Sequence, residues 1–238
     1  MTIYTQSRPD SSTTRKVTRW IIREIMGTIM MGVILMLAAG RIDWIAGWAL
    51  IILTALWVVA TALVVIPRHP DLLAERVGPT KGTKSWDTAI LGIYGLLTMV
   101  RYIVAGLDVR NQWSTGFGVS AQVAGLIVAA VGYGLVVWAM GANAYFSQTV
   151  RIQTERGHTV ATGGPYHFVR HPSYVGMILF ELASAVMLAS WWALLLSGLS
   201  SVLFVVRTAL EDHTLQAELP GYVAYTQKTR YRLIPGIW

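Results

Sequence analysis

A polar segment over residues 156–176, RGHTVATGGPYHFVRHPSYVG, carries side chains that are well suited to chemistry. Its Gly-Gly-Pro predicts a tight turn, and Pro172 suits the first turn of a following helix. The start of such a helix, next to Arg170 and His171, offers free backbone N–H groups to a carboxylate or phosphate. The alternative is that this basic, aromatic loop only anchors a membrane helix to lipid headgroups.

A second reactive segment begins at Arg207 and places two neighbouring carboxylates, Glu211 and Asp212, beside His213. Such a pair can bind a cation, accept hydrogen bonds from hydroxyl groups, or bind a metal with a nearby histidine. The alternative is a solvated helix in which Arg207 and Glu211 form an i,i+4 pair worth only about 0.2–0.5 kcal/mol.

Metal binding is not expected from the histidines of these segments. His158, His167, His171 and His213 lie near the acidic pair in sequence, but their spacing matches no metal-binding pattern such as HExxH. The chain also has no cysteine, which excludes disulfides, thiolate metal sites and a cysteine nucleophile. We predict anchoring of the loop as the role of His158 and His167.

The composition predicts an integral membrane protein. Apolar residues make up 54% of the 238 residues and charged residues only 13%, against about 25% charged in soluble domains. The net charge of +7 is therefore explained by loop charges that orient the chain in a membrane. A nucleic-acid partner is not expected.

The apolar residues gather in runs long enough to cross a bilayer, which takes about 20 residues. The last run has 33 residues, about 50 Å as one helix, so we predict a hairpin that turns near residues 190–192. We therefore expect an all-α fold with about six transmembrane helices. A cleaved signal peptide is the alternative for the first run, but the polar lead before it is long. The runs cover residues 25–40, 44–66, 88–106, 119–140 and 174–206.

The basic residues predict the orientation. Of the 19 Lys and Arg residues, 16 fall in segments that six helices would place on one side. Because cytoplasmic loops carry the excess of Lys and Arg, both termini are expected in the cytoplasm, with the protein in the cell's inner or plasma membrane. Residues 1–17 are expected to form a polar arm and residues 18–140 the first four helices.

Two charges lie inside the expected helices, and charges at that depth are candidates for function. On a rise of 1.5 Å per residue Arg101 lies about 20 Å and Glu181 about 10 Å from the cytoplasmic side. The two could pair across this offset, or Arg101 could reach outward to the headgroups. Both are kept as candidate substrate-site residues.

Four features occur together in the last part of the chain. They are the GPYHFVRHPSYVG string over residues 164–176, the hairpin, the acidic pair, and Tyr-x-x-Tyr and Ile-Pro patterns near the end. In this combination residues 139–238 resemble the isoprenylcysteine carboxyl methyltransferase family. The resemblance implies a methyltransferase core over residues 141–238, in which a cytoplasmic cap binds S-adenosylmethionine while a lipophilic acceptor enters between helices.

Carried over by position, the resemblance implies a cofactor site with two walls. We predict Arg170, His171 and Glu211 as the catalytic residues. The donor is a sulfonium cation with an amino acid and an adenosine, which carboxylates, an arginine and aromatic rings suit. A carboxylate acceptor needs no base, whereas an amine or thiol would lose its proton to His171 or Glu211. The cofactor-binding residues are Tyr166, Arg170, His171, Pro172, Tyr174 and Gly176 on one wall and Glu211, Asp212, Tyr222 and Tyr225 on the other.

The chain departs from the family pattern in ways that leave the acceptor open. The acidic pair is Glu-Asp where Glu-Glu is usual, and the run over residues 119–140 lacks the arginine that prenylcysteine enzymes are expected to hold for the substrate carboxylate. The expected partners are a lipophilic small molecule or lipid as substrate, and membrane lipids. The sequence does not determine the oligomeric state.

Two other functions remain as alternatives. A membrane NADPH-dependent reductase of the sterol type has a similar acidic and tyrosine pattern in its tail. A transporter or membrane scaffold is the other alternative, although the chain lacks the inverted hydropathy repeats and broken midplane helices of many transporters.

Overall fold

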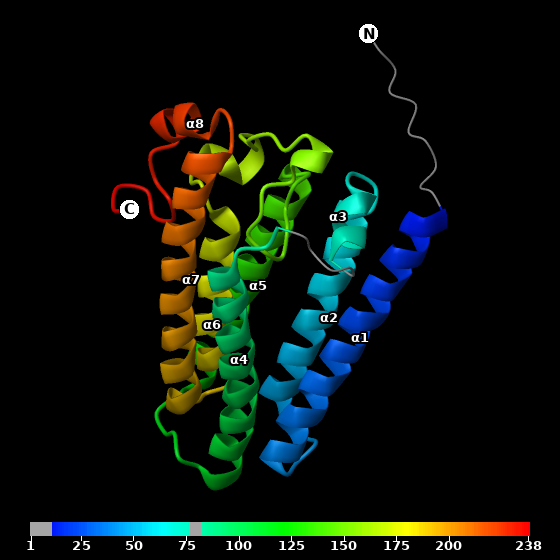
Figure 1. Ribbon diagram of the computed structural model, residues 1–238. Coiled ribbons are helices and arrows are strands. Elements are labelled where there is room, and N and C mark those ends of the chain that lie inside the picture. Colours follow the sequence, from blue (N-terminus) through cyan, green and yellow to red (C-terminus); the bar gives the residue numbers. More distant parts are fainter. Residues whose placement is uncertain (1–10, 77–81) are drawn as a thin grey trace.

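The computed structural model describes residues 11–76 and 82–238, in which all regular secondary structure is helical (Figure 1). The expected all-α membrane architecture is confirmed. The helices are α1 (Ser11–Ala39), α2 (Ile45–Val65), α3 (Pro70–Glu75), α4 (Ser85–Asn111), α5 (Val119–Ala142), α6 (Pro172–Met187), α7 (Trp191–Glu218) and α8 (Tyr222–Lys228), with 3-10 turns η1 (Thr154–Arg156) and η2 (Gly164–His167).

Five of the described helices, α1, α2, α4, α5 and α7, are long and apolar enough to cross a membrane, whereas α6 is apolar but shorter. The expected hairpin is present, because α6 ends at Met187 and α7 begins at Trp191. Ala189 makes the tight turn between them with φ 58°. The second arm does not end near residue 206 as expected. It continues to Glu218, because the polar residues after the apolar run extend a helix that is already nucleated.

The first helix also starts earlier than expected. A polar arm is expected over residues 1–17, but the chain is helical from Ser11, and residues 1–10 lie outside the described part. The same physical reason applies, since adding a turn to an existing helix avoids the cost of nucleation. The polar composition of this stretch therefore predicted its exposure better than its conformation.

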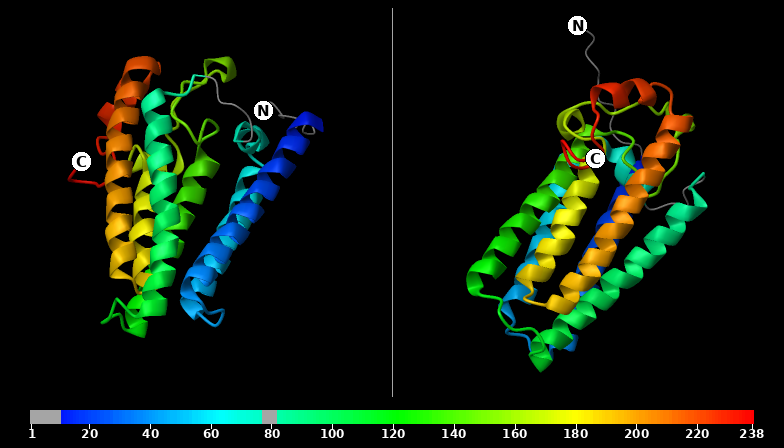
Figure 2. Two further views of the ribbon diagram at one scale, coloured as in Figure 1. Left: turned by 60° about the horizontal axis from the view of Figure 1, so that its bottom comes forward. Right: turned by 90° about the vertical axis from the view of Figure 1, so that its left-hand side faces the viewer.

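The helices form a bundle in which α5, α6, α7 and α4 pack in succession, with the α1–α2 pair on one side (Figures 1 and 2). The α1–α2 pair lies near α4 at one end of the bundle and diverges from it towards the other. At the near end the packing is tight, because a Cβ on Gly106 of α4 would lie 2.8 Å from the carbonyl oxygen of Leu35 in α1.

The contact between α5 and α6 depends on two glycines that face each other. A Cβ on Gly132 would lie 2.6 Å from the carbonyl oxygen of Gly176, and a Cβ on Gly176 would lie 2.5 Å from that of Gly132. The backbones therefore approach as closely as the small residues at membrane helix interfaces allow. This contact fixes the start of α6, and with it residues 170–174.

Inside the bundle, Arg101 of α4 and Glu181 of α6 form a fully buried ion pair of 2.9 Å. Tyr94 donates a hydrogen bond of 2.9 Å to the same carboxylate, and Arg101 also donates to Ser184. Of the two arrangements considered from the sequence, the structure has the pair, and Arg101 does not reach outward. The two side chains meet because α4 and α6 do not begin at the same level: Arg101 lies farther along α4 from Ser85 than Glu181 lies along α6 from Pro172.

One end of the bundle carries a cap, by which we mean residues 143–171 and 219–238. It contains η1, η2, α8 and the carboxyl-terminal tail, and the first described turns of α1 lie at the same end (Figures 1 and 2). Gly164 has φ 58°, and a Cβ there would lie 3.0 Å from Ala142, so the turn predicted from Gly-Gly-Pro requires a glycine.

Candidate active site

A cavity of about 460 Å³ lies where the cap meets the helices, within the size range of small-molecule sites. Its upper part is lined by polar side chains of the cap and of the helix ends, and its lower part by apolar side chains of the bundle. The polar group includes Tyr145, Arg151, His158, Tyr166, Arg170, His171 and Glu211, and the apolar group Trp57, Leu91, Val136, Met140, Met177 and Phe204.

Asp212 does not line this cavity but lies behind it, fully buried, as the centre of a polar network. Its two oxygens accept hydrogen bonds from Arg170, Tyr222 and Arg232 at distances of 2.7–3.1 Å. His171 Nε2 lies 3.4 Å from the same carboxylate. Asp212 thus holds together the start of α6, helix α8 and the tail.

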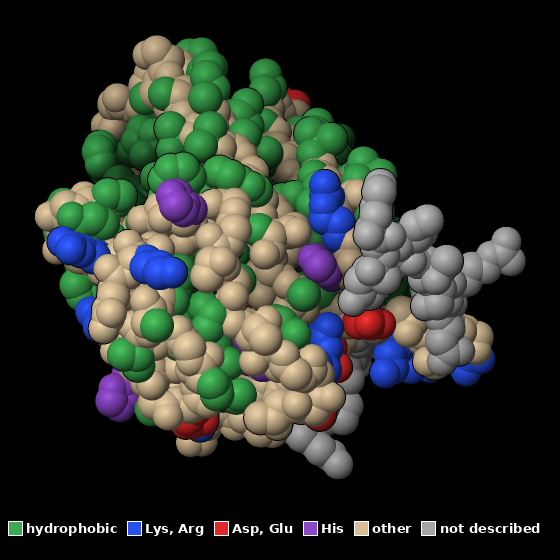
Figure 3. Space-filling model, turned by 90° about the horizontal axis from the view of Figure 1, so that it is seen from above, with side chains coloured by type: hydrophobic (Ala, Val, Ile, Leu, Met, Phe, Trp, Pro, Cys, Tyr) green, Lys and Arg blue, Asp and Glu red, His purple; other side chains and the backbone are tan. Residues whose placement is uncertain are grey.

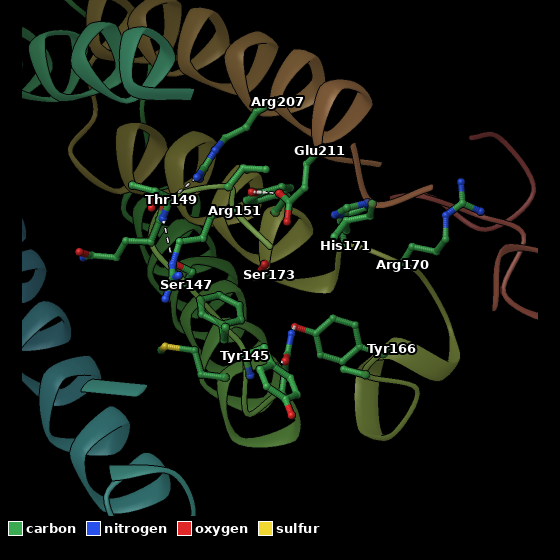
Figure 4. Close-up of a pocket in the computed structure, with 18 of the residues that line it drawn as sticks. Tyr145, Ser147, Thr149, Arg151, Tyr166, Arg170, His171, Ser173, Arg207 and Glu211 are labelled. Carbon is green, nitrogen blue, oxygen red and sulfur yellow. Dashed lines mark hydrogen bonds between the residues drawn. The ribbon is translucent and has the colours of Figure 1, made fainter. Parts of the chain in front are cut away.

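The guanidinium of Arg170 is already bound to other residues of the protein. It binds Asp212 with Nε and Nη2, and its Nη1 donates to the carbonyl oxygens of Thr229 and Arg230 at 3.0 and 2.7 Å. The side chain lines the cavity at its edge but points towards the tail, away from Glu211 (Figure 4). Its contacts favour a role in closing the cap.

Glu211 is the carboxylate that faces the cavity (Figure 4). It is half-buried and accepts a hydrogen bond from the hydroxyl of Tyr174, whose ring stacks on His171 at 5.7 Å. Arg207 does not pair with Glu211, so that alternative is wrong. It forms a bidentate pair with the buried Asp87 at 2.6 and 3.2 Å, because α4 lies alongside α7.

Three tyrosines of the predicted site line the cavity and fix the cap. Tyr225 donates a hydrogen bond of 2.6 Å to the carbonyl oxygen of Tyr166, and the hydroxyl of Tyr166 accepts a hydrogen bond of 3.2 Å from Asn143. Burial raises the pKa of Tyr166, and it raises the pKa of Tyr225 to about 12. Burial also raises the pKa of Tyr222, which donates to Asp212. All three phenols therefore remain protonated donors at neutral pH.

Besides Asp212, four predicted residues do not line the cavity. Pro172 and Gly176 do not line the cavity, because Pro172 starts α6 and Gly176 packs against α5. Arg101 and Glu181 are also absent from the lining and bind each other. Their link to the cavity is Tyr94, which lines it and donates to Glu181.

Several lining residues were not predicted. Arg151 is buried and pairs with Glu75 and Glu155 at 2.6 Å each. His158, expected only to anchor the loop, also lines the cavity, and its Nδ1 accepts from the backbone N–H of Gln153 at 3.3 Å. Burial, aided by the charges of nearby arginines, lowers the pKa of His158 to about 4, so its ring stays neutral. No local sequence pattern identifies these residues, because their partners come from distant elements.

Within the described ranges no three His, Asp or Glu side chains gather as metal ligands. His167 and His213 are exposed. Seen from the cap end, basic and histidine side chains lie across the surface (Figure 3).

Comparison with known proteins supports the resemblance expected from the sequence. Residues 123–217 match the isoprenylcysteine carboxyl methyltransferase (ICMT) family. A protein-S-isoprenylcysteine O-methyltransferase B of Arabidopsis thaliana is 27% identical over 147 residues, which are 56% of this chain and 68% of the relative. A protein-S-isoprenylcysteine O-methyltransferase of Dictyostelium discoideum is 26% identical over 171 residues, 71% of this chain and 68% of the relative.

A solved structure has a similar fold. The eukaryotic intramembrane Ras methyltransferase ICMT aligns with a TM-score of 0.50 and 17% identity over 95% of each chain. The alignment therefore includes the amino-terminal helices, for which the sequence showed no resemblance beyond their being membrane helices.

Fold and comparisons together define an integral membrane methyltransferase. The expected resemblance to the isoprenylcysteine carboxyl methyltransferase family is confirmed.

Proposed function

We propose that this protein transfers a methyl group from S-adenosylmethionine to the carboxylate of a lipophilic acceptor of the isoprenylcysteine type. The observation that carries the proposal is the single cavity that joins a polar cap to apolar membrane helices. A charged donor and a lipid-like acceptor need such opposite surroundings within reach of one another. The names of the similar proteins support the same acceptor.

The upper part of the cavity fits the donor. Glu211 offers a half-buried carboxylate to the cationic groups of S-adenosylmethionine, and the rings of Tyr166, Tyr222 and Tyr225 offer aromatic faces. Asp212, which is saturated by its own partners, would hold this wall in place without touching the donor.

The lower part fits an apolar chain that ends in a carboxylate. Its walls come from α2, α4, α5, α6 and α7, and they include Trp57, Val136 and Met177. Arginines outnumber carboxylates in the cavity lining, which favours an anionic acceptor over a cationic amine.

The bound donor would supply an electrophilic methyl group on a sulfonium. The acceptor oxygen forms the new O–CH₃ bond while the S–CH₃ bond breaks and its electron pair stays on sulfur, so no proton moves. The residues of this chain would act by orienting both partners and excluding water, and positioning of this kind can contribute up to about 7–11 kcal/mol in favourable cases. No general base is required, so His171 is assigned to the polar network.

We also propose that the cap faces the cytoplasm. Of 19 Lys and Arg residues, 16 belong to segments at the cap end or to the amino-terminal stretch that leads into α1. Such a bias is typical of the cytoplasmic side of membrane proteins and supports this orientation.

The test is methyl transfer by the purified full chain in lipid nanodiscs, with tritium in the donor methyl group and N-acetyl-S-farnesylcysteine as acceptor. We expect label in the acceptor that mild base releases as volatile methanol, as from an ester. Label that resists base would show an amine or thioether product and contradict the carboxylate assignment. Absence of transfer, together with thermal protection by NADPH and not by S-adenosylhomocysteine, would favour a reductase.

A further inference from the structure

Arg76 brings an unpaired positive charge into the cavity. It lies just after α3, is half-buried and lines the site. No carboxylate in the described part of the chain lies within ion-pair distance of its guanidinium. Its Nε is buried without a hydrogen-bond partner among the described residues, and its Nη2 contacts the sulfur of Met140 at 3.2 Å.

An unpaired guanidinium in such surroundings is unfavourable unless a ligand compensates it. Burial lowers the pKa of Arg76 to about 10, against the charge of Glu24, which raises it from beyond ion-pair distance, so the group remains charged at neutral pH. The other cavity arginines differ in this respect. Arg151, Arg170 and Arg207 each have a carboxylate partner at 2.6–2.7 Å. Among these four cavity arginines, Arg76 alone has no carboxylate partner in the described part of the chain. We therefore expect an anionic group of a ligand to bind next to it.

The surroundings of Arg76 identify which anion. Its guanidinium lies over the ring of Phe146 at 5.3 Å and against Met140, at the end of α5. Met140 is one of the apolar side chains that the bundle helices contribute to the cavity lining, whereas Glu211 and the tyrosines come from α7 and the cap. Helix α5 itself contributes no arginine. Arg76 thus adjoins the apolar half, where an acceptor chain would lie.

We infer that Arg76 binds the carboxylate of the lipophilic acceptor and selects acidic over neutral acceptors. The inference rests on the proposed function and adds the residue that recognises the reacting group. A guanidinium suits this task, since its fork of N–H donors matches a carboxylate. Each carboxylate oxygen has two lone-pair sites, so an oxygen that accepts a hydrogen bond from Arg76 would keep a lone pair with which to attack the methyl group.

The experiment measures binding without any donor present. N-acetyl-S-farnesylcysteine and its carboxamide are titrated calorimetrically into the wild type and into R76Q, R76K and R68Q. Arg68 is an exposed arginine in the segment between α2 and α3 and does not line the cavity, so R68Q is the matched control. We expect the wild type and R68Q to bind the acid at least about tenfold tighter than the amide, and R76Q to lose that preference. R76K should keep part of it.

Two further measurements separate this role from others. The Kd of S-adenosylhomocysteine should change less than about twofold in R76Q, while the KM for the acid rises at least about tenfold. The melting temperature of ligand-free R76Q should equal or exceed that of the wild type, because an unpaired charge is removed.

Several results would overturn the inference. They are a wild type that binds acid and amide equally, an acid preference that survives in R76Q, and weakened S-adenosylhomocysteine binding with acid binding intact, which would assign Arg76 to the donor. A wild type that prefers the acid but transfers no methyl group would leave Arg76 assigned and would contradict the proposed function instead.

Discussion

Two adjacent carboxylates illustrate how neighbouring residues take different roles. Glu211 and Asp212 are consecutive on α7, so their side chains project about 100° apart around the helix. Glu211 faces the cavity with a hydroxyl partner, and Asp212 is buried among Arg170, Tyr222 and Arg232. The sequence predicted that the pair matters but could not separate a ligand-facing carboxylate from a structural one.

We expect Arg170 to contribute mainly to the stability of the folded protein and to affect catalysis only through it. Replacing it in R170A removes one of the two arginines that pair with the buried Asp212, leaving Arg232, and frees the carbonyl oxygens of Thr229 and Arg230, so we expect a loss of about 1–3 kcal/mol of unfolding free energy. Chemical unfolding in detergent, followed by circular dichroism, measures it. R230A is the matched control, because the Arg230 side chain is exposed and only its backbone holds Arg170. A fully stable but inactive R170A variant would contradict this structural role and would support a catalytic role of Arg170.

Site residues that belong to a local sequence motif could be predicted from the sequence. Residues whose ion-pair partners lie far away in the sequence could not. Tyr166, His171 and Glu211 came from motifs and do line the cavity. Asp87 pairs with Arg207 across 120 positions in the sequence, and Arg151 with Glu75 across 76. Only the folded chain brings such partners together.

At the scale of elements, the spans were predicted to within a few residues where charge-free runs define them. Helix α2 covers Ile45–Val65 against an expected 44–66, and α5 covers Val119–Ala142 against 119–140. The end of α7 and the start of α1 were missed, because hydropathy does not register a polar extension of a membrane helix. That extension of α7 carries Glu211, so the missed element is the one that positions the site.

The glycine contact between α5 and α6 yields a prediction about an element. Gly132→Ala would place a methyl group 2.6 Å from the carbonyl oxygen of Gly176 and 2.9 Å from the backbone nitrogen of Phe180. Backbone cannot yield as a flexible side chain does, so we expect a loss of about 1–3 kcal/mol, seen as a lower melting temperature in detergent.

A neighbouring glycine on the same helix serves as the control. Gly134 has no atom within 4 Å of an added Cβ, so Gly134→Ala should leave the melting temperature unchanged or raise it, since alanine favours a helix. Equal destabilisation by both substitutions would show that helix flexibility, and not the close contact with α6, requires the glycines.

At the scale of the whole molecule, the fold combines a polar and an apolar environment in one cavity. The α1–α2 pair diverges from α4 towards the cap (Figure 1). Trp57 of α2 and Leu91 of α4 line the same cavity as Glu211. The bundle supplies an apolar wall and the cap a polar one. The proposed methyl transfer to a membrane-borne carboxylate requires the donor and the acceptor to occupy the polar and the apolar half of the cavity at the same time.

The most direct test of this account is a calorimetric titration of S-adenosylhomocysteine into the purified full chain in nanodiscs, with wild type and E211Q compared. We predict saturable binding by the wild type and at least about tenfold weaker binding by E211Q, whose melting temperature stays close to that of the wild type, because the half-buried Glu211 pairs with Tyr174 alone among the described residues. A folded wild type that shows no saturable binding below millimolar concentration, or an E211Q variant that binds as tightly as the wild type, would contradict it.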